Sequence, residues 1–296
     1  MLRNLLRFTK RSVRQGLWPL LQRYVVLRKI LSLPPAKLDT ESSFCVHVLL
    51  CERDVIMFHW MLRSLLTVWR GPFQVMVHDD GSLTKKSIAA INASFPGVDV
   101  VEKREAATRM AEALNGHAEL LEWWRASHWA QKALDVYMLG NSRYMVLLDA
   151  DLLFLGNPSE LFTEESTSVW MRDSSYMLDI EPQESVARFG GHPLPALNAG
   201  LGRIERSRFR LDLAEKLLRH LRTPSNDMVF HALMTAQKSD FRLLPATYDC
   251  SLECGLKGVI ARHYTNPVRF WYYEEGVPRV AKRLGLRLHP WMRERI

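Results

Sequence analysis

The 296-residue sequence predicts an α/β protein with a Rossmann-like, mostly parallel central sheet flanked by helices. Three observations predict this class. Short apolar runs alternate with longer runs whose apolar residues recur at helical spacing, as in successive strand–helix units. Acidic residues directly follow several of the short runs. The composition, with 47% hydrophobic and 24% charged residues, is typical of a globular chain with a sizeable core.

The first half of the chain carries the clearest pattern. Residues 44–51 (FCVHVLLC) are almost all apolar, as in a strand that is buried on both faces. The helix expected at residues 54–69 has apolar residues at every third or fourth position and ends before Gly71-Pro72. A strand, a helix, a strand, one long helical region and a fourth strand are expected next, at residues 73–80, 84–95, 98–103, 105–139 and 143–155.

The second half is less regular. Short strands and one helix are expected there, at residues 168–173, 196–204, 241–249 and 258–265 for the strands and 210–221 for the helix. We interpret this half as part of the same domain.

Polar residues stand where three of the expected strands end. They are Arg53, Asp54, Asp79, Asp80, Asp149 and Asp151. Ligands bind beyond the carboxyl ends of parallel strands, so we expect these side chains to converge at one edge of the sheet.

The run YMVLLDADLLFL places Asp149 and Asp151 one residue apart in an otherwise apolar stretch. Two carboxylates that face one ligand repel each other, and both stay ionised only with a cation between them. Oxygen ligands suit Mg²⁺ or Mn²⁺, which in turn bind substrate phosphates. We therefore predict a divalent metal at this pair. The alternative is a solvated turn in which the two acids cap a helix.

These features resemble the GT-A nucleotide-sugar glycosyltransferases, and within them the retaining group that includes glycogenin and the bacterial galactosyltransferases of lipooligosaccharide synthesis. The resemblance covers residues 44–275 and rests on motifs in a fixed order. The residues that match them are Lys132, Asp149, Asp151, Asn198, Ala199, Gly200, Asp227, His263 and Arg269. The resemblance implies a GT-A fold, with residues 160–275 as the half that binds the acceptor.

The resemblance also implies roles for single residues. Asp149, Asp151 and His263 are implied as ligands of Mn²⁺ or Mg²⁺. Lys132 and Arg269 are implied as contacts of the nucleotide diphosphate, and Asp149 takes part in nucleotide binding as well.

Asp227 and Asn198 are implied as contacts of the sugar or of the reacting carbon. Together with Lys132 they are the expected catalytic residues, and Asp173 is a further expected sugar contact. Asp227 has an alternative role as the N-cap of a helix.

Three positions depart from the pattern of the family. Arg269 replaces a lysine and keeps a cation for the diphosphate, with planar geometry. Asn266 replaces a glycine, which asparagine tolerates at positive φ. Met228 replaces a glutamine that is proposed to lie beneath the reacting carbon, and this leaves the donor, the acceptor and the stereochemical outcome open.

The other polar strand ends have two interpretations. Arg53, Asp54, Asp79 and Asp80 are candidates for recognition of the nucleotide base and ribose. Turn chemistry is the alternative for the last two, because Asp-Gly favours tight turns.

The implied activity is metal-dependent transfer of a hexose from a nucleoside-diphosphate sugar, with a UDP-sugar favoured, to the hydroxyl of a glycan or lipid-linked acceptor, with retention of configuration. The residues leave other classes open. These are a nucleotidyltransferase, a metal-dependent pyrophosphohydrolase, and a non-catalytic, membrane-associated binding protein with a degenerate transferase fold.

Basic residues are concentrated at the two ends of the chain. Residues 1–37 hold nine Lys and Arg and no acid, so the rest of the chain carries −1 of the net charge of +8. We expect a basic amphipathic arm at residues 1–40, a GT-A domain at 41–276 and a basic tail at 277–296. A nearly neutral body argues against nucleic acid as a partner.

The arm has no apolar stretch long enough to span a bilayer. We expect a cytoplasmic protein whose arm lies peripherally on the anionic inner face of a membrane. A transit peptide and a helix packed on the body are the alternatives.

The sequence also suggests roles for the aromatic residues and a state for the cysteines. Core packing is expected for Trp123, Trp124 and Trp129, and contact with the acceptor is expected for Trp271, Tyr272 and Tyr273. Cys45 and Cys51 are too far apart on one strand for a disulfide, and reduced thiols are the expected state.

Overall fold

The computed structural model describes residues 27–173, 197–220, 241–250, 253, 255–265 and 268–288. A seven-stranded sheet lies at its centre, with the strands in the order β3-β2-β1-β4-β7-β6-β8. The strands are β1 (Phe44–Leu50), β2 (Gln74–Asp79), β3 (Asp99–Val101), β4 (Tyr144–Leu148), β6 (Ser168–Arg172), β7 (Leu197–Glu205) and β8 (Phe241–Leu243). Only β7 runs antiparallel to its neighbours, so the sheet is mostly parallel, as predicted.

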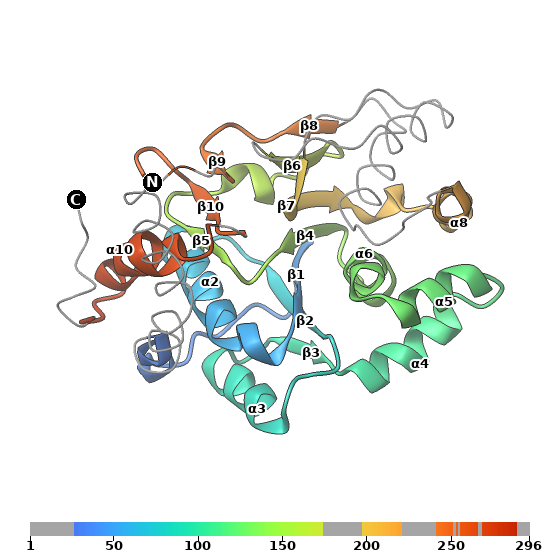
Figure 1. The fold of residues 1–296 in the computed structure, drawn as a ribbon, viewed down its shortest axis with the longest axis horizontal. Helices are drawn as coiled ribbons and strands as arrows, with labels where there is room; N and C mark the ends of the chain where they lie inside the picture. Colours follow the sequence, from blue (N-terminus) through green and yellow to red (C-terminus); the bar gives the residue numbers. More distant parts are fainter. Residues whose placement is uncertain are drawn as a thin grey trace, which may run out of the picture.

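Helices cover both faces of this sheet (Figure 1). The first face carries α2 (Val55–Val68), α3 (Lys85–Ser94) and α10 (Val277–Arg283). The second face carries α4 (Lys103–Ala113), α5 (Ala118–Ala126), α6 (His128–Leu139) and α8 (Leu211–His220). The molecule is therefore a three-layer α/β/α sandwich.

The side chains of β4 show why the strands are so apolar. Tyr144, Val146 and Leu148 pack in the core on the α2 side, while Met145 and Leu147 pack in the core on the α6 side. Successive strand residues point to opposite faces, so a strand between two helical layers must be apolar at every position. This explains the unbroken apolar runs of the sequence.

A second, three-stranded sheet lies beside the carboxyl end of β4. It has the order β5-β10-β9, formed by β5 (Leu152–Phe154), β10 (Ala261–His263) and β9 (Tyr248–Asp249). The strand β10 pairs antiparallel with β5, and His263 lies opposite Leu152. This sheet brings a segment from the end of the chain next to the turn that follows β4.

The long helical region predicted at residues 105–139 consists of three helices, α4, α5 and α6. Gly116 has a φ of 87°, a left-handed conformation that ends α4. Ser127 then caps α6, and its hydroxyl accepts a hydrogen bond from the amide of Trp129 at 3.2 Å. The helical character predicted from the periodicity was correct, but each of the two breaks between the helices depends on a single residue.

Both expected end segments have parts that pack on the body. Leu27 and Ile30, in the 3₁₀ helix η2 (Leu27–Ser32), are buried against α2. Val277 and Val280 of α10 are buried in the same core. The remainder of the arm, residues 1–26, lies outside the described residues. None of the helices described for this chain is long and apolar enough to cross a membrane.

Candidate metal centre and nucleotide site

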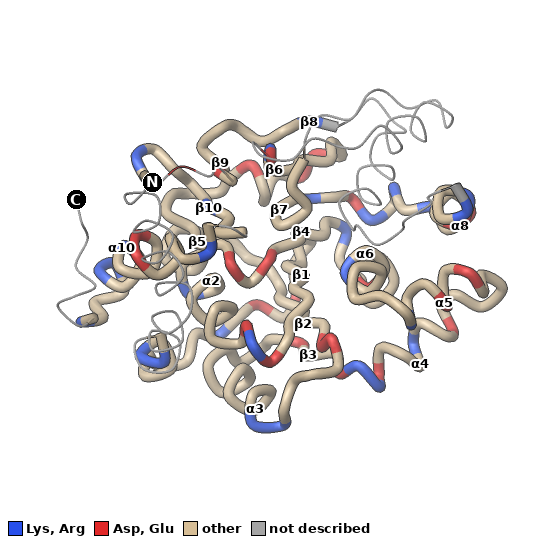
Figure 2. The backbone as a smooth tube through the Cα atoms, in the orientation of Figure 1, with Lys and Arg blue, Asp and Glu red and all other residues tan. Residues whose placement is uncertain are grey.

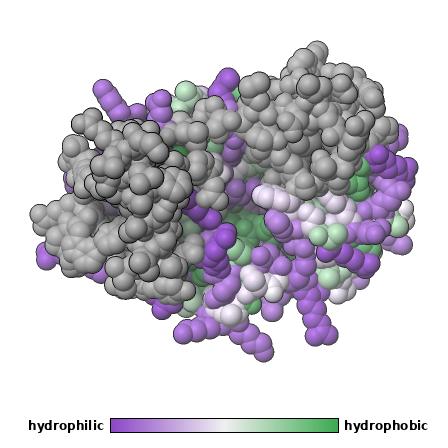
Figure 3. All heavy atoms as spheres, viewed as in Figure 1, coloured by the Kyte–Doolittle hydropathy of each residue, from purple (hydrophilic) through white to green (hydrophobic). Residues whose placement is uncertain are grey.

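The expected polar residues lie at one edge of the central sheet. Acidic segments follow β2 and β4 there, and basic segments lie close by (Figure 2). Figure 3 shows the same side of the molecule, with hydrophobic side chains visible in a central strip and hydrophilic side chains around it. The strand β4 ends at Leu148, so Asp149 and Asp151 stand in the turn between β4 and β5 and not inside a strand.

Backbone hydrogen bonds hold this turn. The amide of Asp149 donates to the carbonyl of Gly200 at 2.8 Å, and the carbonyl of Asp151 accepts from the amide of Tyr264 at 3.1 Å. The first bond ties the turn to β7, and the second ties it to the residue that follows β10. The two carboxylates are therefore fixed between the large sheet and the small one.

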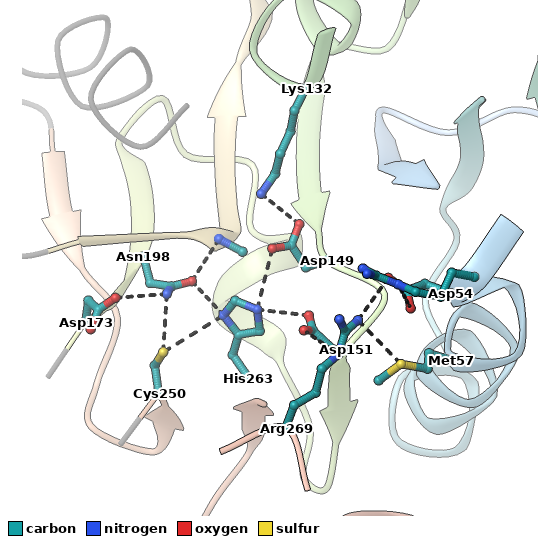
Figure 4. Close-up of polar contacts among 12 residues, drawn as sticks. Asp54, Met57, Lys132, Asp149, Asp151, Asp173, Asn198, Cys250, His263 and Arg269 are labelled. Atoms are coloured by element: carbon teal, nitrogen blue, oxygen red, sulfur yellow. Dashed lines mark hydrogen bonds and ion pairs between the residues drawn. The ribbon is translucent and has the colours of Figure 1, made fainter. Parts of the chain in front are cut away.

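His263 closes the group of ligands from the far end of the chain (Figure 4). Its Nε2 lies 3.0 Å from Asp151 Oδ1 and 3.5 Å from Asp149 Oδ2. One ligand atom from each of the three residues lies within 4.8 Å of the others, and no other such group of His, Cys, Asp and Glu occurs in the described ranges.

This donor set fits a divalent cation. Two ligands bonded to one Mg²⁺ at about 2.1 Å and at right angles lie ~3.0 Å apart, close to the separations of His263 Nε2 from the two carboxylates. Two carboxylates and one imidazole are also a hard, mixed O/N set of the kind that binds Mn²⁺ or Mg²⁺. The residues therefore fit the predicted ion.

The pKa values of Asp151 and His263 also indicate that this site favours positive charge. Burial alone would raise the pKa of Asp151, but the charge and hydrogen bond of His263 outweigh burial and lower that pKa to about 2. Burial alone would lower the pKa of His263, but the carboxylate of Asp151 raises it well above its ordinary value. The site thus favours a cation between its carboxylates.

Two fixed cations flank the centre. Lys132 reaches out from α6, and its Nζ lies 2.7 Å from Asp149 Oδ1. Arg269 donates from Nη2 to Asp54 Oδ2 at 2.9 Å, and its Nε lies 3.5 Å from Asp151 Oδ2. The structure brings both predicted diphosphate contacts to the carboxylate pair, from opposite sides in Figure 4.

The remaining polar strand ends differ from one another. Asp54 is buried and forms ion pairs with Arg269 and with the exposed Arg53. Asp79 accepts hydrogen bonds from the amides of Gly81 and Leu83 at 2.8 and 3.0 Å. These two contacts are turn chemistry, the alternative that the Asp-Gly sequence favoured, and Asp79 Oδ2 also accepts from the amide of Lys103 at 3.3 Å.

Asp80 has the same kind of contacts. Its Oδ1 accepts from the amide and the hydroxyl of Ser82 at 2.9 and 2.6 Å. The structure therefore places Asp54 against Arg269, which flanks the centre, while Asp79 and Asp80 accept hydrogen bonds in the turn after β2.

Asn198 and Asp173 lie behind His263, on the side away from the carboxylates (Figure 4). Asn198 Oδ1 lies 2.8 Å from His263 Nδ1, and its Nδ2 donates to Asp173 Oδ2 at 3.1 Å and to Cys250 Sγ at 3.2 Å. No local pattern pointed to Cys250, because only the pairing of β9 with β10 brings it to the site.

The burial of the aromatic residues differs in part from the expectation. Trp123 and Trp124 are buried in the core, as expected, but Trp129 is 39% exposed at the start of α6. Tyr272 and Tyr273 are buried in the core beside α2, so they pack inside the protein and do not face an acceptor. Asp227, Met228 and Asn266 lie outside the residues that the structure describes.

Solved glycosyltransferases have a similar fold. The galactosyltransferase LgtC, in complex with donor and acceptor sugar analogues, matches 83% of this chain and 97% of its own, with a TM-score of 0.53 and 12% identity. Mouse xyloside xylosyltransferase 1 matches 79% of this chain and 99% of its own, with a TM-score of 0.50 and 12% identity. The glycosyltransferase GlyE of Streptococcus pneumoniae TIGR4 matches 81% of this chain and 63% of its own, with a TM-score of 0.50 and 10% identity.

No protein-family model and no curated protein sequence matches this chain. The likeness is one of architecture, and it defines the class of the fold. The protein has a GT-A fold, as the order of its motifs predicted.

Proposed function

We propose that the protein is a metal-dependent glycosyltransferase that moves a hexose from a nucleoside-diphosphate sugar to an acceptor hydroxyl. One observation carries the proposal: Asp149, Asp151 and His263 come from distant parts of a GT-A fold and present their ligand atoms within 4.8 Å of one another. Lys132 and Arg269 stand beside this group as cations for a diphosphate.

The residues of the centre have two different roles in the proposed reaction. Asp149, Asp151 and His263 would hold Mn²⁺ or Mg²⁺, which supplies Lewis-acid stabilisation of the charge on the departing nucleoside diphosphate. Lys132 and Arg269 add fixed positive charge on either side and hold the diphosphate in one orientation. Both cations are paired with carboxylates here, so they are already oriented before a substrate arrives.

The finer assignments are also proposals. A UDP-sugar is the donor that we favour, with Arg53 and Asp54 beside its base and ribose. The acceptor is a glycan or a lipid-linked sugar, and the transfer retains the anomeric configuration. LgtC, which was solved with donor and acceptor sugar analogues, supports a donor sugar and an acceptor sugar as the two substrates.

The decisive experiment measures release of nucleoside diphosphate from a panel of sugar nucleotides, with Mn²⁺ and with a chelator. We expect Mn²⁺-dependent release that is lost in Asp149→Asn and kept in Asp212→Asn, an exposed control on α8. Release of nucleoside monophosphate or pyrophosphate instead would indicate a pyrophosphohydrolase or a nucleotidyltransferase. Release of neither, with tight nucleotide binding, would indicate a degenerate binding protein.

Thermal shift measurements also distinguish a transferase from a degenerate binding protein. A transferase of this kind gains stability from UDP or GDP chiefly when Mn²⁺ is present, because the diphosphate binds through the metal. Stabilisation by nucleotide that is unchanged by a chelator would contradict the proposed role of the metal.

We also propose that the basic arm contacts an anionic membrane surface from a cytoplasmic location. Arg3, Arg7, Lys10 and Arg14 recur at helical spacing, and basic residues near anionic lipid contribute about 1 kcal/mol each. Replacing these four with glutamate in the full chain should abolish flotation with phosphatidylserine vesicles. Equal flotation of both proteins would contradict this role of the arm.

A further inference from the structure

The buried amide of Asn198 has all of its hydrogen-bonding capacity in use. Its side chain belongs to the second residue of β7, and the residue is 4% exposed. Oδ1 contacts the amide of Gly200 and the imidazole of His263, each at 2.8 Å. Nδ2 contacts Asp173 and Cys250. A carboxamide has two donor hydrogens and two acceptor lone pairs, so these four partners satisfy it completely.

The orientation of this amide follows from its partners. A backbone N–H can only donate, so the atom that faces Gly200 must be the oxygen. A carboxylate accepts hydrogen bonds, so the atom that faces Asp173 must be the nitrogen. Both neighbours give the same assignment, and Asn198 therefore presents an acceptor to His263.

This acceptor determines which imidazole nitrogen keeps its proton. Nδ1 of His263 must donate to Asn198 Oδ1, because two acceptors at 2.8 Å would repel each other. The other nitrogen, Nε2, is the one that faces the two carboxylates. The asparagine thus leaves the correct nitrogen available for a metal.

We propose that Asn198 is a positioning residue, which fixes the tautomer and the ring orientation of His263 so that Nε2 completes the metal centre. Asp173 strengthens the effect, because its negative charge polarises the amide through Nδ2 and makes Oδ1 a better acceptor. The chain of contacts runs Asp173, Asn198, His263, metal. This inference rests on the proposed function and replaces direct contact of Asn198 with the sugar.

The experiment measures binding of Mn²⁺ by the full chain, from the loss of the free-ion signal in electron paramagnetic resonance. Asn198→Ala should weaken Mn²⁺ binding about 10- to 100-fold, the range measured for such outer partners of metal-bound histidines. Cys250→Ala is the matched control, since it leaves Oδ1 of Asn198 in place while it removes the other partner of Nδ2 and a thiol whose contact with His263 Nδ1 is long, at 3.9 Å. It should bind Mn²⁺ within about threefold of the wild type, far less than the outer-partner effect.

An exchange variant tests the chemistry of the pair. Asn198→Asp combined with Asp173→Asn keeps the total charge and returns an acceptor oxygen to His263, with the amide donor now on residue 173. It should bind Mn²⁺ more tightly than Asn198→Ala. Wild-type affinity in Asn198→Ala, or no recovery in a folded exchange variant, would overturn the inference.

A measurement on the wild type stands even if the variants fold poorly. With Mg²⁺ bound, nitrogen-15 NMR of the ring should show the proton of His263 on Nδ1, and protonation on Nε2 would overturn the proposal. Wild-type protein that binds no Mn²⁺ would overturn the metal site of the proposed function as well. Normal Mn²⁺ binding in both wild type and Asn198→Ala would overturn only the role of Asn198.

Discussion

Gly200→Ala should disable the metal centre through a single methyl group. A Cβ at this position would lie 2.3 Å from Cε1 and 2.6 Å from Nδ1 of His263, and 2.8 Å from Oδ1 of Asn198. Carbon atoms pack comfortably at about 3.5 Å or more, so the ring would have to move by about 1.2 Å. Such a movement breaks the bond between His263 and Asn198, which is 2.8 Å long.

The expected magnitude has two parts. Overpacking of a tight interior costs about 1–3 kcal/mol, and a buried polar group left without its partner costs a further ~1–3 kcal/mol. We therefore expect Gly200→Ala to lower the free energy of unfolding by about 2–6 kcal/mol. The Mn²⁺ affinity of the folded protein should fall by at least 10-fold, because His263 loses its support.

Gly202→Ala is the matched control on the same strand. Its Cβ would lie 2.3 Å from the ring of Trp170, so the packing conflict is similar but it falls outside the metal centre. Urea unfolding should show destabilisation in both variants, while Mn²⁺ titration should show a loss of affinity only in Gly200→Ala. Wild-type Mn²⁺ affinity in folded Gly200→Ala, or an equal loss in Gly202→Ala, would refute the reasoning.

Four further outcomes follow from the geometry. Asp151→Asn should reduce Mn²⁺-dependent release of nucleoside diphosphate by about 100-fold or more, measured at saturating donor, because it removes a metal ligand. Arg269→Lys should retain part of that activity, since one ammonium cannot make the two separate contacts of the guanidinium to Asp54 and Asp151, and activity equal to wild type would contradict this. Burial raises the pKa of Asp135 to about 7. Between about pH 4 and 7 the folded protein therefore holds a proton that the unfolded chain has lost, so the free energy of unfolding falls as pH rises through this range. In urea unfolding across this pH range, the free energy of unfolding of the wild type should decline by up to ~4 kcal/mol, and that of Asp135→Asn should lack this decline. Parallel pH profiles of the two proteins would contradict this assignment. Trp129→Ala should raise the acceptor KM about three- to tenfold without changing hydrolysis of the donor alone, because an exposed indole one helical turn from the proposed diphosphate contact can stack on a sugar. An unchanged acceptor KM would refute this contact.

The sequence predicted the layers of the fold because burial on two faces leaves a direct trace. Strand β1 is buried at almost every position, and the run at residues 44–50, apolar except for His47, indicates this without any long-range information. The small sheet left no such trace. Strands β9 and β10 are two and three residues long, and their pairing depends on contacts across the whole domain.

The three candidate metal ligands were selected from the sequence for two different reasons. Asp149 and Asp151 stood out locally, because two acids interrupt an apolar run. His263 was found only through the resemblance to known motifs, since one histidine after a short strand has no distinctive local pattern. The contacts of Asn198 with Cys250 and Asp173 could not be predicted, because those residues meet only after three strands have assembled.

The same assembly explains why the motif Asn198-Ala199-Gly200 has its composition. The asparagine supplies an acceptor to His263, the buried alanine packs in the core on the α6 side, and the glycine lets the imidazole ring lie against the strand. The carbonyl of the glycine also accepts the amide hydrogen of Asp149. One short segment of β7 therefore contacts a proposed metal ligand on each side. The distance between the carboxylate turn and the imidazole is set by β7, so the geometry of the centre depends on a strand that contributes no ligand of its own.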